Sequence, residues 1–337
     1  MTETDTTRPR SKERQMRAKL IFNPGAGAAK GSPPQIMDVI HEMQAWNIVP
    51  EAFLIEEGCD LPGMVQDALT QGIEFFVVCG GDGTISPVAG ILAGTGATLG
   101  IIPLGTQNNM ALSLGIPEDV PAAVALLRAG RRIQVDVGMA TYQSPEAGGG
   151  EITVPFLELC SVGLVSELFP PTDDIQHGNL ARAGDLLATL VSSTPAEIHL
   201  ILDGMQEVRA KSHVVLVTNM PYVGSHYLVG EADSYDDGLL DVLFFADLGK
   251  LDLVNFILYG VQPENVEDPR IQRFRVRRVE INTEPAMAIM ADGVALGAGP
   301  VRIEVRPRVL SMMAGQPAPS AQPVPGEGLE KTYATAG

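Results

Sequence analysis

The residues best suited to chemistry form the run Gly-Gly-Asp-Gly-Thr at positions 80–84. Glycines let main-chain N–H groups approach an anion closely, and the start of a following helix adds partial positive charge. Asp82 would repel a bare phosphate, but it could engage Mg²⁺ or an acceptor hydroxyl, as phosphoryl transfer requires. The alternative is a tight turn in which Asp82 caps the next helix. Three glycines around one aspartate favour the functional interpretation.

Four short apolar runs predict buried strands, and each is followed by a polar or glycine-rich segment. The strands are expected at 20–22, 51–55, 75–79 and 98–102, and the segments behind them at 23–27, 57–58, 80–84 and 103–108. Helical patterns between the strands predict a mainly parallel sheet with right-handed crossovers. Ligands bind such sheets beyond the carboxyl ends of the strands, so all these segments are expected at one edge.

The helices expected between these strands differ in how clearly they begin. The first carries Ile36, Val39, Ile40 and Met43 on one face, and its start is marked by Ser32 as N-cap, Pro33 and Gln35. A helix behind the 80–84 run is expected to start near Ser86 and Pro87. Weaker patterns cover 64–69, 88–92, 110–114 and 122–127.

From about residue 133 the pattern changes to short alternating strands. These are expected at 133–137, 152–159, 197–202, 208–217, 239–245, 274–281, 286–290 and 301–305, with helices near 180–190 and 251–258. Asp203-Gly204 and Asp292-Gly293 are typical hairpin turns. We expect loose tails at 1–17 and 314–337, an α/β domain at 18–131 and a β-sandwich at 132–313, whose last strand could return to the first domain.

Composition excludes several classes of protein. The 337 residues include 23 Lys and Arg against 41 Asp and Glu, a formal net charge of −18, which argues against nucleic-acid binding. No apolar run approaches the ~20 residues of a membrane-spanning helix. The polar, basic start does not resemble a secretory signal, and the three cysteines show no metal-ligand spacing. A cytoplasmic protein is expected.

Several motifs in one order resemble the diacylglycerol/sphingosine-type lipid kinase catalytic domain family, in its bacterial soluble branch. They are Asn23-Pro24, the 80–84 run, Pro103-x-Gly105-Thr106-x-Asn108, the 236–242 segment and Asp292-Gly293, and the resemblance covers roughly 19–313. It implies a doubly wound, phosphofructokinase-like nucleotide-binding domain followed by a β-sandwich, with ATP in the cleft between them. It also implies transfer of the γ-phosphoryl group to a hydroxyl of diacylglycerol, a sphingoid base or a related lipid.

The resemblance also implies site residues. Asp82 and Asp292 are the candidate catalytic residues, although Asp292 has a simpler role in a hairpin turn. The residues expected to hold ATP are Asn23, Gly80, Gly81, Asp82, Gly83, Thr84, Ser86, Gly105, Thr106 and Asn108. A structural Mg²⁺ would be held by Asp237 and the carbonyls of Ser234 and Leu239, unless this segment is only a turn. The lipid would be met peripherally at the inner membrane surface, and a homodimer is compatible with the family.

This chain departs from the family pattern at four places, one of which is Leu54 where a threonine of the second strand is expected. Ser86-Pro87 replaces Asn-Glu, Asn109 replaces an aspartate, and Val294 replaces the glutamate proposed as general base. General-base assistance is typically worth ~10²–10⁴ in rate, whereas phosphoryl transfer depends more on positioning and charge neutralisation. The sequence therefore predicts a lipid kinase that is slow. The alternatives are a kinase for a soluble acceptor, of the NAD kinase type, and a nucleotide- or lipid-binding regulator without turnover.

One further pattern alternates Arg273, Arg275 and Arg277 with apolar residues, which places the three arginines on one strand face. A solvated outer face is the simpler interpretation, and contact with anionic headgroups is the alternative.

Overall fold

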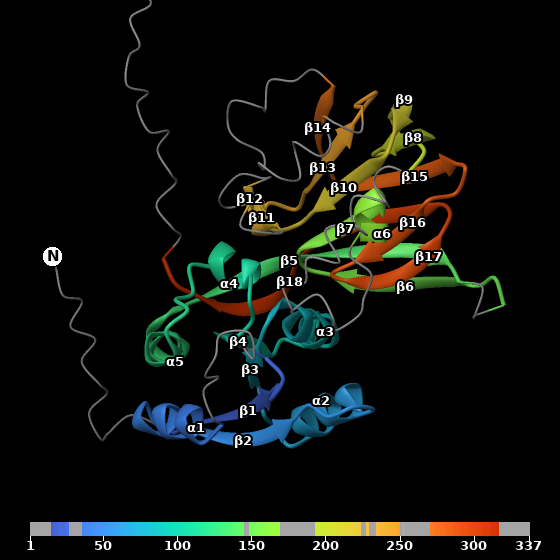
Figure 1. Cartoon of the computed structure of the whole chain (residues 1–337). Coiled ribbons are helices and arrows are strands. Elements are labelled where there is room, and N and C mark those ends of the chain that lie inside the picture. The colour runs from blue at the N-terminus through green and yellow to red at the C-terminus, as the bar shows by residue number, and fades with distance from the viewer. Residues whose placement is uncertain are drawn as a thin grey trace, which may run out of the picture.

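The computed structural model describes residues 15–26, 36–144, 148–168, 193–223, 227–228, 234–249, 252 and 270–316. An α/β unit and a unit of antiparallel strands follow one another along the chain, and Figure 1 shows the first below the second. The predicted fold class, an α/β domain followed by a β-sandwich, is confirmed. Among the described residues, no helix combines the length and the apolar composition needed to cross a membrane.

The first unit is built on four parallel strands in the order β2-β1-β3-β4. They are β1 Met16–Phe22, β2 Ile48–Leu54, β3 Phe75–Gly80 and β4 Thr98–Pro103. Every residue of β3 and β4 is buried, because helices cover both faces of the sheet. The four apolar runs therefore predict the strands to within a few residues at each end.

Alternate strand residues face two different helix layers. Ala18, Leu20, Val77 and Cys79 pack with one pair of helices, and Phe76 and its neighbours on the other face pack with a second pair. The first pair is α1 Ile36–Ala45 and α5 Val120–Ala129, and the second is α2 Leu61–Thr70 and α3 Asp82–Leu92. The short helix α4 Asn109–Ser113 follows β4. The predicted cap of α1, at Ser32 to Gln35, lies outside the described residues.

Helix α3 corrects one prediction. It begins at Asp82 and not near Ser86 and Pro87, so that Pro87 lies inside it. The N–H groups of Thr84 and Ile85 both donate to the Gly81 carbonyl, at 2.8 and 3.0 Å, and fix the first turn before the proline. Pro87 removes only the bond to the carbonyl four residues earlier. The glycine run is thus the start of the helix as well as the loop before it.

The second unit packs two layers of mainly antiparallel strands. One layer continues the first sheet through β18-β15-β8-β9, with β5 and β6 beside β18, and the other has the order β14-β13-β10-β7-β16-β17. The layers enclose a core that includes Phe156, Val217, Phe244 and Ile303. The strands are β5 Arg131–Gln143, β6 Glu151–Phe156, β7 Leu159–Gly163, β8 Ala196–Leu202, β9 Gln206–Ser212, β10 Val214–Thr218, β13 Leu240–Phe245, β14 Ile271–Val276, β15 Arg278–Glu284, β16 Ala288–Ala291, β17 Val294–Ala298 and β18 Val301–Ala314.

Shorter elements complete the described part. They are α6 Leu164–Leu168, β11 Tyr222–Val223, β12 Tyr227–Leu228 and the 3₁₀ turn η3 Ser234–Asp236. The predicted helices at 180–190 and 251–258 lie outside the described residues, apart from position 252.

Strand β18 connects the two units. It pairs with β4 in parallel at Ser311 and Met312, and with β5 in antiparallel register from Val301 to Ala314. A register shift between Arg306 and Leu310 separates the part that belongs to the sandwich from the part beside β4. The end of the described chain thus returns to the first sheet and holds the two units in one continuous sheet.

Three predicted strands are each two strands in the structure. The runs at 152–159, 208–217 and 274–281 are broken at 157–158, at His213 and at Arg277, where the chain crosses from one layer to the other. Both halves of each run pack on the same core. The alternation stays in phase across 157–158 but shifts by one residue at His213 and at Arg277, where Phe274 and Val276 are followed by Val279 and Ile281. Only these one-residue shifts mark the last two crossings in the sequence.

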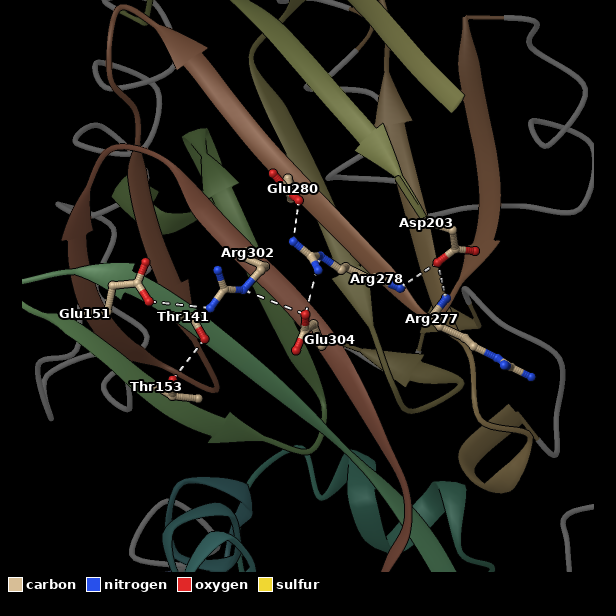
Figure 2. Close-up of polar contacts among 9 residues, drawn as sticks. All are labelled: Thr141, Glu151, Thr153, Asp203, Arg277, Arg278, Glu280, Arg302 and Glu304. Atoms are coloured by element: carbon tan, nitrogen blue, oxygen red, sulfur yellow. Dashed lines mark hydrogen bonds and ion pairs between the residues drawn. The ribbon is translucent and has the colours of Figure 1, made fainter. Parts of the chain in front are cut away.

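The outer face of the sandwich carries ion pairs within and between neighbouring strands (Figure 2). Arg302 lies 3.5 Å from Glu151 and 3.7 Å from Glu304, and Arg278 lies 3.4 Å from Glu304 and 2.5 Å from Glu280. Exposed pairs of this kind each contribute about 0–1 kcal/mol. This face is a solvated surface.

Candidate active site

Two loops meet backbone to backbone at the carboxyl ends of β3 and β4. The Leu104 N–H donates to the Gly80 carbonyl over 2.9 Å. A Cβ atom on Gly81 would lie 2.9 Å from the Gly105 Cα, and one on Gly105 would lie 2.6 Å from the Gly81 Cα. A side chain at either position would force the loops apart. Glycine at 81 and 105 therefore lets the two strand ends form one continuous rim.

Asn23 connects the end of β1 to this rim. Its Nδ2 donates to the Thr84 Oγ1 over 2.8 Å, and its Oδ1 accepts from the Gly25 N–H over 2.9 Å. A Cβ on Gly80 would lie 2.9 Å from the Cβ of Thr84. The side chains of Asn23 and Thr84 thus support the rim from below. The structure brings together these residues, which the sequence assigned to one site.

Gly83 differs from the other rim glycines. Its backbone φ is not positive, and a Cβ at this position would meet nothing within 4 Å. The residue is exposed in the first turn of α3. Glycine in a helix is about 0.5–1 kcal/mol less favourable than alanine, and no neighbour in the described chain requires it here. Open space above the first N–H groups of a helix fits the close approach of an anion such as a phosphate.

Asp82 uses its carboxylate to cap α4. Its Oδ2 accepts from the Asn109 N–H over 3.1 Å, and its Oδ1 accepts from the Met110 N–H over 3.2 Å. Burial raises the pKa of Asp82, these hydrogen bonds partly offset the shift, and the negative charge of Asp292 adds to it. The side chain caps a helix, as the alternative interpretation proposed. The capped helix is α4, whereas Asp82 itself lies in α3. A role of Asp82 at the terminal phosphate stays a prediction.

Asn108 shapes the second loop from its left-handed backbone conformation, with φ of 53°. Its Nδ2 donates to the Gly105 carbonyl over 3.0 Å. Its buried Oδ1 has no hydrogen-bond partner within the part of the chain that the structure describes. Thr106, between these two residues, is exposed at the rim. Asn108 therefore holds the loop, whose exposed residues are Thr106 and Gln107.

Asp292 joins the two units. It occupies the predicted β16–β17 hairpin with Gly293, at φ of 43° and 81°. Its carboxylate also accepts from the N–H groups of Leu157, Glu158 and Leu159, at 2.6, 3.0 and 2.9 Å, and from the Ser86 hydroxyl on α3. Burial raises the pKa of Asp292, and these donors partly offset the shift. The residue thus has both proposed features, a turn conformation and a place beside the site.

Glu158 is a site residue that the sequence reasoning missed. It lies half-buried between β6 and β7, and its Oε1 accepts from the Asn109 Nδ2 over 2.8 Å. The signal was a glutamate inside the apolar run at 152–159, where a carboxylate needs a polar partner. Val294, at the position expected to hold the general base, is half exposed.

The predicted structural magnesium site has a different environment. The Asp237 Oδ1 accepts from the Leu239 N–H over 2.8 Å, and its Oδ2 pairs with the Arg275 guanidinium. In the described chain, no group of three His, Cys, Asp or Glu side chains could hold a metal ion. Both carboxylate oxygens of Asp237 thus have partners, which does not fit a resident cation. The site at Ser234, Asp237 and Leu239 stays a prediction.

Two family models match the two units of the chain. Residues 17–140 match the diacylglycerol kinase catalytic domain. Residues 172–314 match the YegS C-terminal NAD kinase beta sandwich-like domain. The first match contains the whole glycine rim, and the second contains Asp292 and Val294.

Similar proteins match this chain over most of their length. A diacylglycerol kinase of Bacillus subtilis is 25% identical over 82% of this chain and 89% of its own. One of Mycobacterium tuberculosis is 27% identical over 75% of this chain and 81% of its own. The crystal structure of a diacylglycerol kinase from Bacillus anthracis has a TM-score of 0.66 at 21% identity, over 90% of this chain and 98% of that chain. Yeast NADH kinase has a TM-score of 0.51 at 10% identity, over 90% of this chain and 85% of its own, and so shares the fold.

Proposed function

We propose that this chain transfers the γ-phosphoryl group of ATP to a hydroxyl of diacylglycerol. The chain belongs to the diacylglycerol kinase catalytic domain family with a YegS-type C-terminal domain, which is the premise of the proposal. The observation that carries this proposal is the open glycine rim, above all Gly83, which neither its backbone conformation nor a neighbour explains. A ligand that approaches the main chain at this point explains it.

The rim supplies the groups that a triphosphate needs. The N–H groups of Asp82 and Gly83, the first two residues of α3, have no acceptor within the helix, and the helix adds partial positive charge there. The contact between Gly81 and Gly105 keeps both loops in register, so their main-chain donors face one ligand. Catalysis of phosphoryl transfer depends mostly on such positioning and on charge neutralisation.

Magnesium enters this proposal with the nucleotide, as the Mg·ATP complex. Mg²⁺ then neutralises the charge that develops on the phosphoryl oxygens. The chain's own contribution is to orient the phosphates on the rim and to keep Asp82 and Asp292 engaged with main-chain donors. The acceptor lipid reaches the site from a membrane surface that the protein contacts peripherally.

The test is phosphoryl transfer by the purified full chain. Protein, [γ-³²P]ATP and Mg²⁺ are incubated with mixed micelles of diacylglycerol and phosphatidylglycerol, and with NAD in a parallel reaction. Label in phosphatidic acid supports the proposal. Label in NADP, or no labelled lipid from a chain that binds Mg·ATP, contradicts it.

Two variants control for contaminating kinases. Gly105→Ala should lose the label, because its Cβ would displace the Gly81 loop. Glu304→Gln, on the solvated face in Figure 2, should retain it. Equal labelling by both variants would show that another enzyme produces the phosphatidic acid.

A further inference from the structure

We infer that Asn219 is a positioning residue for the phosphoryl transfer, an inference that rests on the proposed function. Its buried side chain fixes the connection between β6 and β7, and the main chain of this connection binds the Asp292 carboxylate. Asp292 in turn accepts the hydroxyl of Ser86 on α3, the helix that begins at the rim. Asn219 therefore acts through Asp292 on the alignment of the sandwich with the rim.

Asn219 lies between the cores of the two units. Val217, two residues earlier, packs in the sandwich core, and Met220, the next residue, packs in the core of the first unit. An apolar side chain would suit such a place, yet this position, only 2% exposed, holds an asparagine. Its Oδ1 is buried without a hydrogen-bond partner among the described residues, which reduces stability. The advantage of asparagine here therefore lies in its N–H donors.

The donors of Asn219 join two segments that are far apart in the sequence. Its Nδ2 donates to the Asp136 carbonyl on β5 and to the Leu157 carbonyl, each over 3.0 Å. Its main-chain N–H donates to the Glu158 carbonyl over 3.1 Å. A carboxamide nitrogen carries two N–H groups, so one side chain holds both carbonyls, which neither aspartate nor leucine could do. Asp136 lies opposite the register shift of β18, so Asn219 anchors the β6–β7 connection where the two units meet.

Asn219 and Asp292 hold the same connection through opposite main-chain groups. Asn219 donates to the carbonyls of residues 157 and 158. The Asp292 carboxylate accepts from the N–H groups of residues 157, 158 and 159. Without Asn219 these peptide groups are free to rotate, and their N–H groups no longer converge on the carboxylate that contacts Ser86. Because transfer depends on how the acceptor faces the γ-phosphorus, a misplacement of about 1 Å can cost about 10²-fold in rate.

The test is Asn219→Ala in the lipid kinase assay. We expect kcat to fall about 10–10²-fold. The Kd for Mg·ATP, measured by calorimetry, should stay within about threefold of wild type, because the contacts within the rim are unchanged. Asn282→Ala, at an exposed position of β15, is the matched control and should retain full activity. A kcat above a third of the wild-type value, or an equal loss of affinity for Mg·ATP, overturns the inference.

A double-mutant cycle separates positioning through Asp292 from a purely structural role. If Asn219 acts through Asp292, the Asn219→Ala, Asp292→Asn double variant should have a kcat within about threefold of the lower single variant. Two losses that multiply overturn the inference while the proposed function stands. Asn219→Ser, which keeps one side-chain donor, replaces Asn219→Ala in both measurements if alanine prevents folding. A wild-type chain that phosphorylates no lipid overturns both.

Discussion

The same dipeptide, Asp-Gly, has different roles at the rim and at the domain junction. At the rim, Gly83 has no positive φ and no crowding neighbour, while the Asp82 side chain caps α4, the helix that follows the 105–108 loop. At the junction, Gly293 has φ of 81° in a hairpin. The Asp292 carboxylate accepts hydrogen bonds from three main-chain N–H groups in the connection between β6 and β7. The positive φ at position 293 favours glycine, whereas the backbone conformation at position 83 does not.

This difference shows how a glycine can indicate a ligand. Gly81 is explained by crowding against Gly105, and Gly293 is explained by its left-handed conformation. A glycine with neither reason, in a helix where it reduces stability, indicates that something outside the chain needs the space. The two regions can therefore be compared by substituting alanine for glycine in each.

The largest effect is expected from Gly81→Ala. Its Cβ would meet the Gly105 backbone at 2.9 Å, which cannot be relieved by turning a side chain. We expect a loss of about 2–3 kcal/mol in the free energy of unfolding, measured in urea, and at least a hundredfold loss of lipid kinase activity. Gly293→Ala should lose only about 1 kcal/mol through its positive φ. Equal losses in the two variants would remove the distinction.

The junction is tested by Asp292→Asn against Asp203→Asn. Both aspartates occupy hairpin turns with positive φ, a conformation that asparagine tolerates, and both accept main-chain N–H groups. Asp203 is exposed, whereas Asp292 is held between the two units. We expect a loss of about 2–3 kcal/mol for Asp292→Asn and below about 1 kcal/mol for Asp203→Asn in urea unfolding. Similar values would show that the junction adds nothing to an ordinary turn.

The pH dependence of stability sharpens the same contrast. Burial raises the pKa values of Asp82 and Asp292, so the folded chain holds these protons more tightly than the unfolded chain. Their contribution to stability is therefore largest at acid pH and falls as the pH rises from about 4 through the raised pKa values. The slope for one such group is at most about 1.4 kcal/mol per pH unit. Asp292→Asn should flatten it, and an unchanged slope would contradict the assignment.

The smallest effect is expected at Asp237. Asp237→Asn removes the partly exposed ion pair with Arg275 but keeps an oxygen for the Leu239 N–H, so the loss should be about 0.5 kcal/mol. Mg²⁺ should not change the Tm of either protein. A Tm that rises with Mg²⁺ in the wild type alone would establish the magnesium site that the sequence predicts.

The sequence predicted the parts of the fold that depend on local pattern. The buried strands β3 and β4 and the turns at Asp203 and Asp292 followed from apolar runs and Asp-Gly pairs. The breaks at His213 and Arg277 did not, because both halves of each run pack on the same core and only a one-residue shift of the alternation marks each crossing. The predicted start of α3, near Ser86 and Pro87, was wrong, since a glycine run does not resemble a helical turn.

The candidate site was predicted as a set of segments but not as a network. The parallel sheet alone brings the loops after β1, β3 and β4 together. The contacts of Glu158 with Asn109 and of Asp292 with Ser86 depend on how the sandwich packs on the first unit, between residues far apart in the sequence. In the sequence, the only signal of such contacts is a charged residue within an apolar run.

The most direct test of the rim is Mg·ATP binding to wild type and Gly83→Ala, measured by isothermal titration calorimetry. Alanine meets no atom within 4 Å and suits a helix, so the free energy of unfolding should stay the same or rise by up to about 1 kcal/mol. If phosphates lie against the main chain here, the affinity for Mg·ATP falls at least tenfold in this equally stable variant. Equal affinities in the two proteins would contradict the account.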